Sequence, residues 1–157
     1  MYLPEEAGLS AYRAWLTALH FPEEDARLSY GVIKAGEIYS DECIRVFAIP
    51  TRHILGGTYP SFAFLIEGEG KRMIYTGDLA PDFSDYPREA VTEEIDLILS
   101  ELVHFDPEKN LDRIAESKTK RLIFTHLSPR KAEYIKTVLP RFPFPVSIAE
   151  DNQAHEI

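Results

Sequence analysis

Apolar residues recur along this chain with two different spacings. Between residues 4 and 20 they lie three and four positions apart, which places them on one face of a predicted helix. These positions are Leu9, Tyr12, Leu16 and Leu19. Pro4 followed by two acids suits a first helical turn, and Phe21-Pro22 is expected to end the helix.

Further along the chain the apolar runs become short and typical of strands. The first four runs comprise residues 28–33, 44–49, 61–67 and 71–76. Gly36 and the polar residues 40–42 separate the first two runs. Gly68-Glu69-Gly70 separates the last two, which therefore predict a hairpin with a three-residue turn.

From residue 95 onwards, predicted strands and helices alternate. The strands are expected at 95–101, 122–125 and 145–149, and the helices at 107–117 and 129–139. Such alternation predicts parallel strands joined by right-handed crossovers, with helices covering the sheet. With the earlier hairpin, the pattern predicts an α/β (α+β) protein. We see no repeat, linker or boundary, so residues 1–157 are expected to form a single domain.

Length and composition are those of an ordinary globular domain. The chain has 157 residues, of which 45% are hydrophobic and 27% charged, enough for one domain with a core. No apolar run approaches the roughly 20 residues of a membrane span. The acidic start Met1–Glu6 lacks the basic region of a signal peptide. We therefore expect a cytoplasmic protein without a membrane partner.

Charge and cysteine content narrow the possible chemistry. The net charge of −9, from 17 basic and 26 acidic residues, disfavours nucleic acid as a partner, because that binding needs a positive surface. A small anionic substrate stays open, since bound divalent metals would reverse the local field. Cys43 is the single cysteine, so an intrachain disulfide and a thiolate metal cluster are excluded. We expect Cys43 to be a small buried apolar residue.

Three predicted strands lead into a potential metal ligand. These residues are His53, Asp78 and His126, and Gly77 lets the chain turn sharply before Asp78. Ligands just beyond strands can present chemistry at a sheet edge, so three such ends could hold a metal. Taken singly, each has an ordinary interpretation: a loop histidine, an aspartate in an Asx turn, and a histidine beside a helix cap.

His104 is a fourth candidate, because it follows the strand predicted at 95–101. A neutral histidine near pH 7 can donate or accept a proton in catalysis. Glu101 lies three residues earlier, at the end of that strand. The alternative is a surface histidine ahead of a helix that Asp106 is expected to cap.

The order of these residues resembles the metallo-β-lactamase superfamily over about residues 44–157. The pattern that carries the resemblance is His53, then Gly77-Asp78 after a hairpin, then Glu101 with His104, then Thr125-His126-Leu127-Ser128. It is most similar to the branch that holds ribonuclease Z-like enzymes and the phosphonate-pathway cyclic phosphodiesterase. The resemblance implies an αββα sandwich. This chain looks like its C-terminal part, because the superfamily's His-x-His-x-Asp-His signature does not occur in it.

The resemblance also implies roles for the residues. His53, Asp78 and His126 would be ligands of two divalent metal ions, most simply zinc, with manganese or iron as alternatives. Asp78 would bridge the ions, and a metal-bridged hydroxide would attack a phosphodiester or similar ester. His104 and Glu101 would be the catalytic residues, with His104 acting on the leaving oxygen. The implied substrate is a small anionic ester.

Three ligands shared between two ions leave each short of the roughly four that a zinc site uses. We therefore expect the isolated chain to be incompetent. Its exposed apolar surface would be covered by an N-terminal half-domain or by self-association. Two alternatives remain. One is a non-catalytic remnant or interaction module of the same fold. The other is a receiver- or flavodoxin-like domain with Asp78 as phosphoacceptor, against which the hairpin argues.

Overall fold

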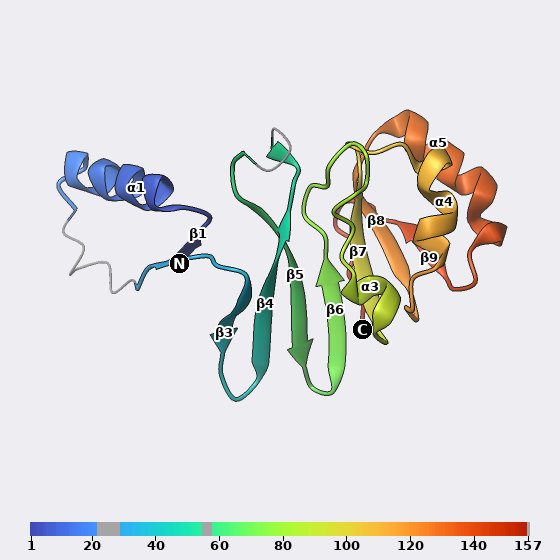
Figure 1. Ribbon diagram of the computed structural model, residues 1–157, viewed down its shortest axis with the longest axis horizontal. Helices are drawn as coiled ribbons and strands as arrows, with labels where there is room; N and C mark the ends of the chain where they lie inside the picture. The colour runs from blue at the N-terminus through green and yellow to red at the C-terminus, as the bar shows by residue number, and fades with distance from the viewer. Residues whose placement is uncertain (22–28, 55–57, 157) are drawn as a thin grey trace.

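The computed structural model of the protein describes residues 1–21, 29–54 and 58–156. Its centre is a mixed sheet of seven strands (Figure 1). In their order across the sheet, these are β3 (Gly36–Ser40), β4 (Ile44–Thr51), β5 (Ser61–Gly68), β6 (Lys71–Tyr75), β7 (Leu97–Leu102), β8 (Leu122–Leu127) and β9 (Val146–Ile148). Neighbouring strands are antiparallel from β3 to β6 and parallel from β6 to β9.

Helices cover one face of this sheet (Figure 1). They are α3 (Glu89–Thr92), α4 (Pro107–Ala115) and α5 (Pro129–Val138), and the short 3-10 helix η2 (Leu139–Arg141) follows α5. Strand register links a row of apolar residues across the sheet, Leu65, Ile74, Ile98 and Leu122. These share one buried core with Ala90, Leu111, Ile114 and Ile135 of the helices. The predicted fold class, a mixed sheet covered by helices, is therefore confirmed.

Two of the predicted helices begin as their sequences indicate. The Asp106 side chain accepts a hydrogen bond from the Glu108 backbone N–H at 3.1 Å, so Asp106 caps α4 as predicted. Ser128 is the N-cap residue of α5, although its side chain makes no capping bond. Proline occupies the first position of both helices, where its missing N–H costs nothing. Among the described helices, none combines the length and apolarity that a bilayer span needs.

The predicted hairpin joins β5 to β6, but its turn is shorter than expected. Gly68 pairs with Lys71, so the turn has two residues, Glu69 and Gly70, and not three. Their φ angles of +51° and +72° are the pair that a two-residue hairpin turn of the favoured primed kind requires. The two-residue turn sets the register of β6 against β5.

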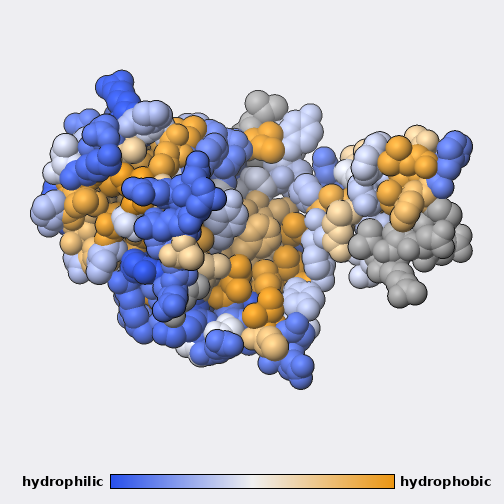
Figure 2. Space-filling model, turned by 180° about the vertical axis from the view of Figure 1, so that it is seen from behind, coloured by the Kyte–Doolittle hydropathy of each residue, from blue (hydrophilic) through white to orange (hydrophobic). Residues whose placement is uncertain are grey.

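The opposite face of the sheet carries a second apolar surface. Side chains alternate between the two faces along a strand. Residues next to the helix-facing row therefore point the other way, and register links Val46, Ile66 and Met73 there. Figure 2 shows the corresponding hydrophobic surface over the middle of the sheet. Ile44 and Tyr75, with 39% and 43% of their surface exposed, lie on strands of the same region.

The N-terminal segment stands beside the main sheet (Figure 1). Here β1 (Tyr2–Leu3) pairs in parallel with β2 (Gly31–Val32), and α1 (Glu6–Ala18) follows β1. The helix predicted over 4–20 is present, but it begins two residues later than Pro4. The strand predicted over 28–33 is reduced to β2, and residue 28 lies outside the described residues.

Two other expectations are wrong, and one alternative is excluded. Gly36 and Ser40, expected to separate strands, are the first and last residues of β3, which pairs with β4 through Glu37 and Tyr39. Cys43 is exposed and not buried, since it lies in the turn where the Asp41 carboxylate accepts from the Cys43 N–H at 2.8 Å. The receiver-like alternative required five consecutive parallel strands, whereas β3 to β6 are antiparallel.

Candidate metal centre

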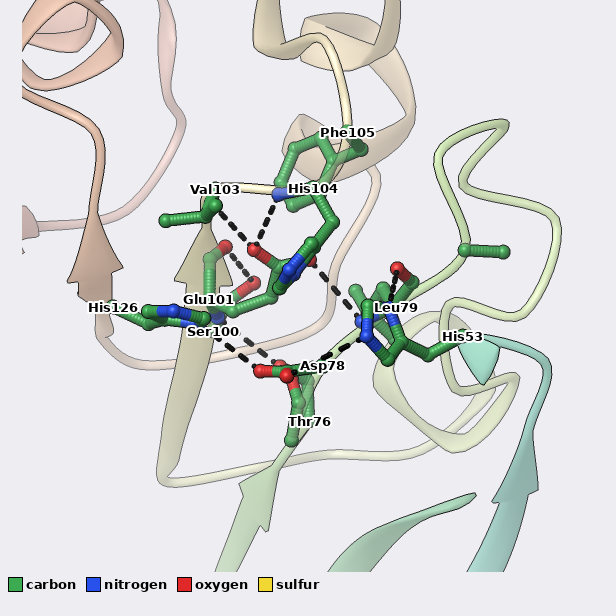
Figure 3. A network of polar contacts seen from close by, with 12 residues as sticks. His53, Thr76, Asp78, Leu79, Ser100, Glu101, Val103, His104, Phe105 and His126 are labelled. Carbon is green, nitrogen blue, oxygen red and sulfur yellow. Dashed lines mark hydrogen bonds and ion pairs between the residues drawn. The ribbon is translucent and has the colours of Figure 1, made fainter. Parts of the chain in front are cut away.

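Four strand ends meet at one edge of the sheet, because β4, β6, β7 and β8 run in the same direction. The candidate residues lie at these ends (Figure 3). His53 follows β4, Asp78 follows β6, Glu101 and His104 lie at the end of β7 and beyond it, and His126 belongs to β8. The structure therefore brings together all five residues that the sequence predicted. Their individual roles stay predictions.

Asp78 lies between two histidines. Its Oδ1 is 3.0 Å from His126 Nδ1, and its Oδ2 is 3.7 Å from His53 Nε2. The other ring nitrogen of His53, Nδ1, is 3.1 Å from the Leu79 carbonyl oxygen. With its proton on Nδ1, His53 donates to that carbonyl and keeps the Nε2 lone pair toward Asp78. Metal-ligating histidines commonly have such a backbone partner.

Gly77 allows Asp78 to occupy this position, for two separate reasons. Its φ of +55° lies in the left-handed region that favours glycine. In addition, a Cβ on Gly77 would lie 2.8 Å from the Phe62 carbonyl oxygen in β5. Because that oxygen belongs to the backbone of a paired strand, it cannot move aside easily. The glycine before Asp78 is therefore required by both conformation and space.

His126 reaches Asp78 from a bulge in β8. Glu101 pairs with Thr125 and Leu102 pairs with Leu127, so His126 is the extra residue between them. Its φ is +47°, a conformation that costs a residue with a side chain on the order of 1–3 kcal/mol. Bulges commonly redirect a side chain near a functional site. Here the bulge directs the ring of His126 to the Asp78 carboxylate.

His104 lies between the other two rings. Its ring centroid is 4.2 Å from that of His53 and 5.1 Å from that of His126. Its Nδ1 is 3.4 Å from Glu101 Oε1, without the geometry of a hydrogen bond. This buried nitrogen therefore has no hydrogen-bond partner among the described residues. A buried polar atom left unpaired is costly in a native protein, which suggests a ligand at this point.

Glu101 organises the backbone around the histidines. Its side chain is 2% exposed, and burying a carboxylate requires compensating donors. Oε1 accepts from the Leu79 N–H at 3.1 Å, and Oε2 accepts from the N–H groups of Val103 and His104 at 2.5 and 2.9 Å. These bonds join the loop after β6 to the turn after β7. Since both oxygens are engaged, the contacts favour an orienting role for Glu101.

Comparison with known proteins finds similar solved structures but no match to a family model or a curated sequence. One similar solved structure is the metallo-beta-lactamase fold protein YhfI from Bacillus subtilis, with a TM-score of 0.57 and 20% identity over 78% of this chain and 52% of that chain. Another is Igni18, a novel metallo hydrolase from the archaeon Ignicoccus hospitalis, with a TM-score of 0.61 and 14% identity over 83% and 62%.

A third is a diphosphatase from the PhnP family, with a TM-score of 0.60 and 14% identity over 99% of this chain and 57% of that chain. The chain has a metallo-β-lactamase fold. This confirms the resemblance drawn from the order of His53, Asp78, Glu101, His104 and His126. The chain spans 52% and 62% of the first two of these proteins, so it corresponds to a part of their fold.

The donors at this edge of the metallo-β-lactamase fold suit a divalent metal. Ligand atoms of His53, Asp78 and His104 lie within 4.8 Å of one another, and so do those of Glu101, His104 and His126. Imidazole nitrogen with carboxylate oxygen is a donor set of zinc, and it also suits iron. Because Glu101 already binds three N–H groups, the histidines and Asp78 are the available donors. They fit an ion, although closed zinc sites use about four ligands.

A pocket of about 510 Å³ adjoins His104. Ser128, Arg130 and Tyr134 contribute to its wall. Within the described ranges, no hydrogen bond or ion pair engages the polar side-chain atoms of these three residues. The pocket therefore offers a hydroxyl, a guanidinium and a phenol next to the histidine cluster, and these groups could bind the polar or anionic part of a substrate.

Two contributors to the site were missed by the sequence analysis. One is the Leu79 carbonyl beside His53, and a backbone group of this kind leaves no trace in a sequence. The other is Lys131, whose ammonium donates to the carbonyl oxygens of Val103 and Phe105. Its position carried a signal, because Lys131 lies in the first turn of α5, where the helix dipole disfavours a positive charge.

Proposed function

We propose that this protein contributes one part of the active site of a metal-dependent hydrolase that cleaves a phosphodiester or a similar ester. The observation that carries the proposal is the position of Asp78 between His53 and His126, with His104 against both rings. Such a convergence of imidazoles and a carboxylate at strand ends is the arrangement that metal-assisted hydrolysis needs.

In this proposal two divalent ions occupy the centre. Asp78, His53 and His126 would be the residues that hold them. Zinc fits the imidazole and carboxylate donors best, with manganese or iron as alternatives. Bound ions of this kind provide a nucleophile from water at neutral pH and neutralise charge on the ester.

The chain's own residues would then hold the substrate and move a proton. His104 borders the pocket that Arg130 lines, so it can reach the oxygen that leaves with the group held there. In its imidazolium form the ring can donate a proton to that oxygen, and in its neutral form it can donate a hydrogen bond to it. Glu101 would keep His104 in place through the backbone N–H groups of Val103 and His104.

The choice of ester rests on charge and on the neighbouring structures. The net charge of −9 disfavours nucleic acid. The guanidinium of Arg130, which has no hydrogen-bond or ion-pair partner among the described residues, suits a small anion. One protein of similar structure is described as a diphosphatase. We therefore favour a small phosphate-containing ester as the substrate class.

A complementary half-domain is the partner we propose. A compact monomer of 17.9 kDa would expose about 8,000 Å², whereas this chain exposes 9651 Å². Part of the surplus belongs to the N-terminal segment, and part to the apolar face around Val46, Ile66 and Met73. A partner that covers this face could also supply the ligands that the two ions lack. Self-association is the competing arrangement.

A non-catalytic interaction module is the second candidate function. It is favoured by the small number of free donors for two ions and by the uncovered apolar face. In that case the histidines would serve no metal, and the sheet face would be the functional surface. Metal binding separates the two proposals, because the module needs none.

Titration of the 157-residue chain with zinc by calorimetry tests the proposal. We expect saturable binding that is lost in Asp78→Asn and in His126→Ala. Asp112→Asn is the matched control, since Asp112 is 92% exposed and pairs with Arg141 away from the histidines. Equal zinc binding by all four proteins would contradict the assignment. Absence of zinc binding by the unmodified chain would favour the interaction module.

Activity is measured on the completed protein. This is the chain to which a complementary half-domain has been added in trans or joined by fusion. The segment encoded directly upstream of Met1 is the first one to use. A chromogenic phosphodiester with zinc or manganese provides the assay. We expect hydrolysis only when both halves are present.

A further inference from the structure

Lys131 is joined to the turn that carries His104, although it belongs to a different element. Its ammonium donates a hydrogen bond to the Val103 carbonyl oxygen and a second one, 2.5 Å long, to the Phe105 carbonyl oxygen. These are the residues on either side of His104. The contact is half-buried, so water competes with it less than at an open surface.

The same turn is held from its other side by Glu101. That carboxylate accepts from the N–H groups of Val103 and His104. The N–H groups of the turn therefore donate to the buried Glu101 carboxylate, and its carbonyl oxygens accept from the half-buried Lys131 ammonium. Held by both, the backbone of His104 has little freedom to rotate, and its ring lies between those of His53 and His126.

The place of Lys131 along α5 supports a role beyond helix stability. Ser128 is the N-cap, so Lys131 is the third residue of the helix, and no acid lies in this first turn. A cation there opposes the helix dipole. Lys136, in the last turn of the same helix, follows the usual rule and pairs with Glu133 at 2.6 Å. Sequences tend to break local rules at functional sites.

We propose that Lys131 is a positioning residue for His104. Lys131 acts through the carbonyl groups of Val103 and Phe105 and does not touch the substrate. It holds the imidazole where a leaving oxygen arrives from the adjoining pocket. This inference rests on the proposed function for its catalytic consequence, but the geometry of the turn can be tested without activity.

The first test uses the 157-residue chain and nuclear magnetic resonance. The ε1 carbon and proton shifts of His104 are assigned by comparison with His104→Gln. At one fixed pH, we expect them to change in Lys131→Met and to stay unchanged in Lys136→Met. Lys131→Gln, which keeps a donor for one carbonyl, replaces the Met variant if circular dichroism shows that variant to be unfolded. An unchanged His104 shift in the folded Lys131 variant would overturn the inference.

The second test uses the completed protein and steady-state kinetics. A small displacement of a catalytic group can cost on the order of 10²-fold. For Lys131→Met we therefore expect kcat to fall by about that factor, with KM and metal content unchanged. Lys131→Arg should recover part of the loss, because a guanidinium can donate to both carbonyls.

The two proposals fail in different ways. Unchanged kcat in Lys131→Met, or a loss shared equally with Lys136→Met, overturns the positioning role while the hydrolase proposal stands. An inactive completed protein contradicts the hydrolase proposal, and the resonance shifts of His104 then decide the positioning role alone.

Discussion

Replacing Gly77 by alanine tests how the chain is brought to Asp78. Two costs act at this position. The first is the φ of +55°, which costs an alanine on the order of 1–2 kcal/mol. The second is contact of the new Cβ with the Phe62 carbonyl oxygen at 2.8 Å. Relief of that contact must move either β5 or the loop that carries Asp78.

Gly70→Ala is the matched control for this prediction. Gly70 has a φ of +72°, but a Cβ there would meet nothing within 4 Å. Both variants therefore carry the conformational cost, and only Gly77→Ala carries the contact. We expect Gly70→Ala to lose about 1–2 kcal/mol of unfolding free energy. For Gly77→Ala we expect about 2–4 kcal/mol, since overpacking adds roughly 1 kcal/mol or more.

Urea denaturation measures the unfolding free energies of the two variants, and zinc titration measures their affinity for the metal. At about 2–4 °C for each kcal/mol in a domain of this size, the difference is also visible in thermal unfolding. We expect Gly77→Ala to lose zinc affinity because Asp78 is displaced, and Gly70→Ala to keep it. Equal stability losses together with normal zinc binding in Gly77→Ala would refute the reasoning.

Three further predictions address the site, the open face and pH. Asp78→Asn should abolish zinc binding with little effect on thermal unfolding, since Asp78 is partly exposed. Ile66→Glu should reduce association seen by light scattering, whereas Ile74→Ala, in the core, should cost about 2–5 kcal/mol in urea denaturation. The hydrogen bond from Lys120 lowers the pKa of Asp96, so its stabilisation exists above the ordinary carboxyl pKa and disappears as pH falls. Asp96→Asn should therefore destabilise the protein at pH 7, and the difference from wild type should shrink near pH 3.

Much of the sheet and the location of the site could be predicted from the sequence. Short apolar runs bounded by glycine and polar residues predicted most of the strands. Strand ends carrying His53, Asp78 and His126 pointed to one edge, because parallel neighbours end together. Asp106 followed by proline marked the start of α4 through simple capping chemistry. These features depend on local propensity and on spacing along the chain.

Features that depend on register or on distant contacts could not be predicted. The bulge at His126 arises from pairing between β7 and β8, which no local pattern encodes. The sequence predicts a three-residue turn at Gly68-Glu69-Gly70, because glycine is typical of turns, but Gly68 pairs with Lys71 and the turn has two residues. The contact of Lys131 with the His104 turn joins residues 26 and 28 positions apart. Tertiary packing decided each of these.

The metal content and hydrolytic rate of the completed protein test the central claim most directly. We predict about two zinc or manganese equivalents and hydrolysis of a chromogenic phosphodiester. In Asp78→Asn the rate should fall by at least about 100-fold, since removal of even an outer-shell partner of a metal site typically costs 10–100-fold. Asp112→Asn should leave both quantities unchanged. Metal content and hydrolysis that survive Asp78→Asn at their original values would contradict the account.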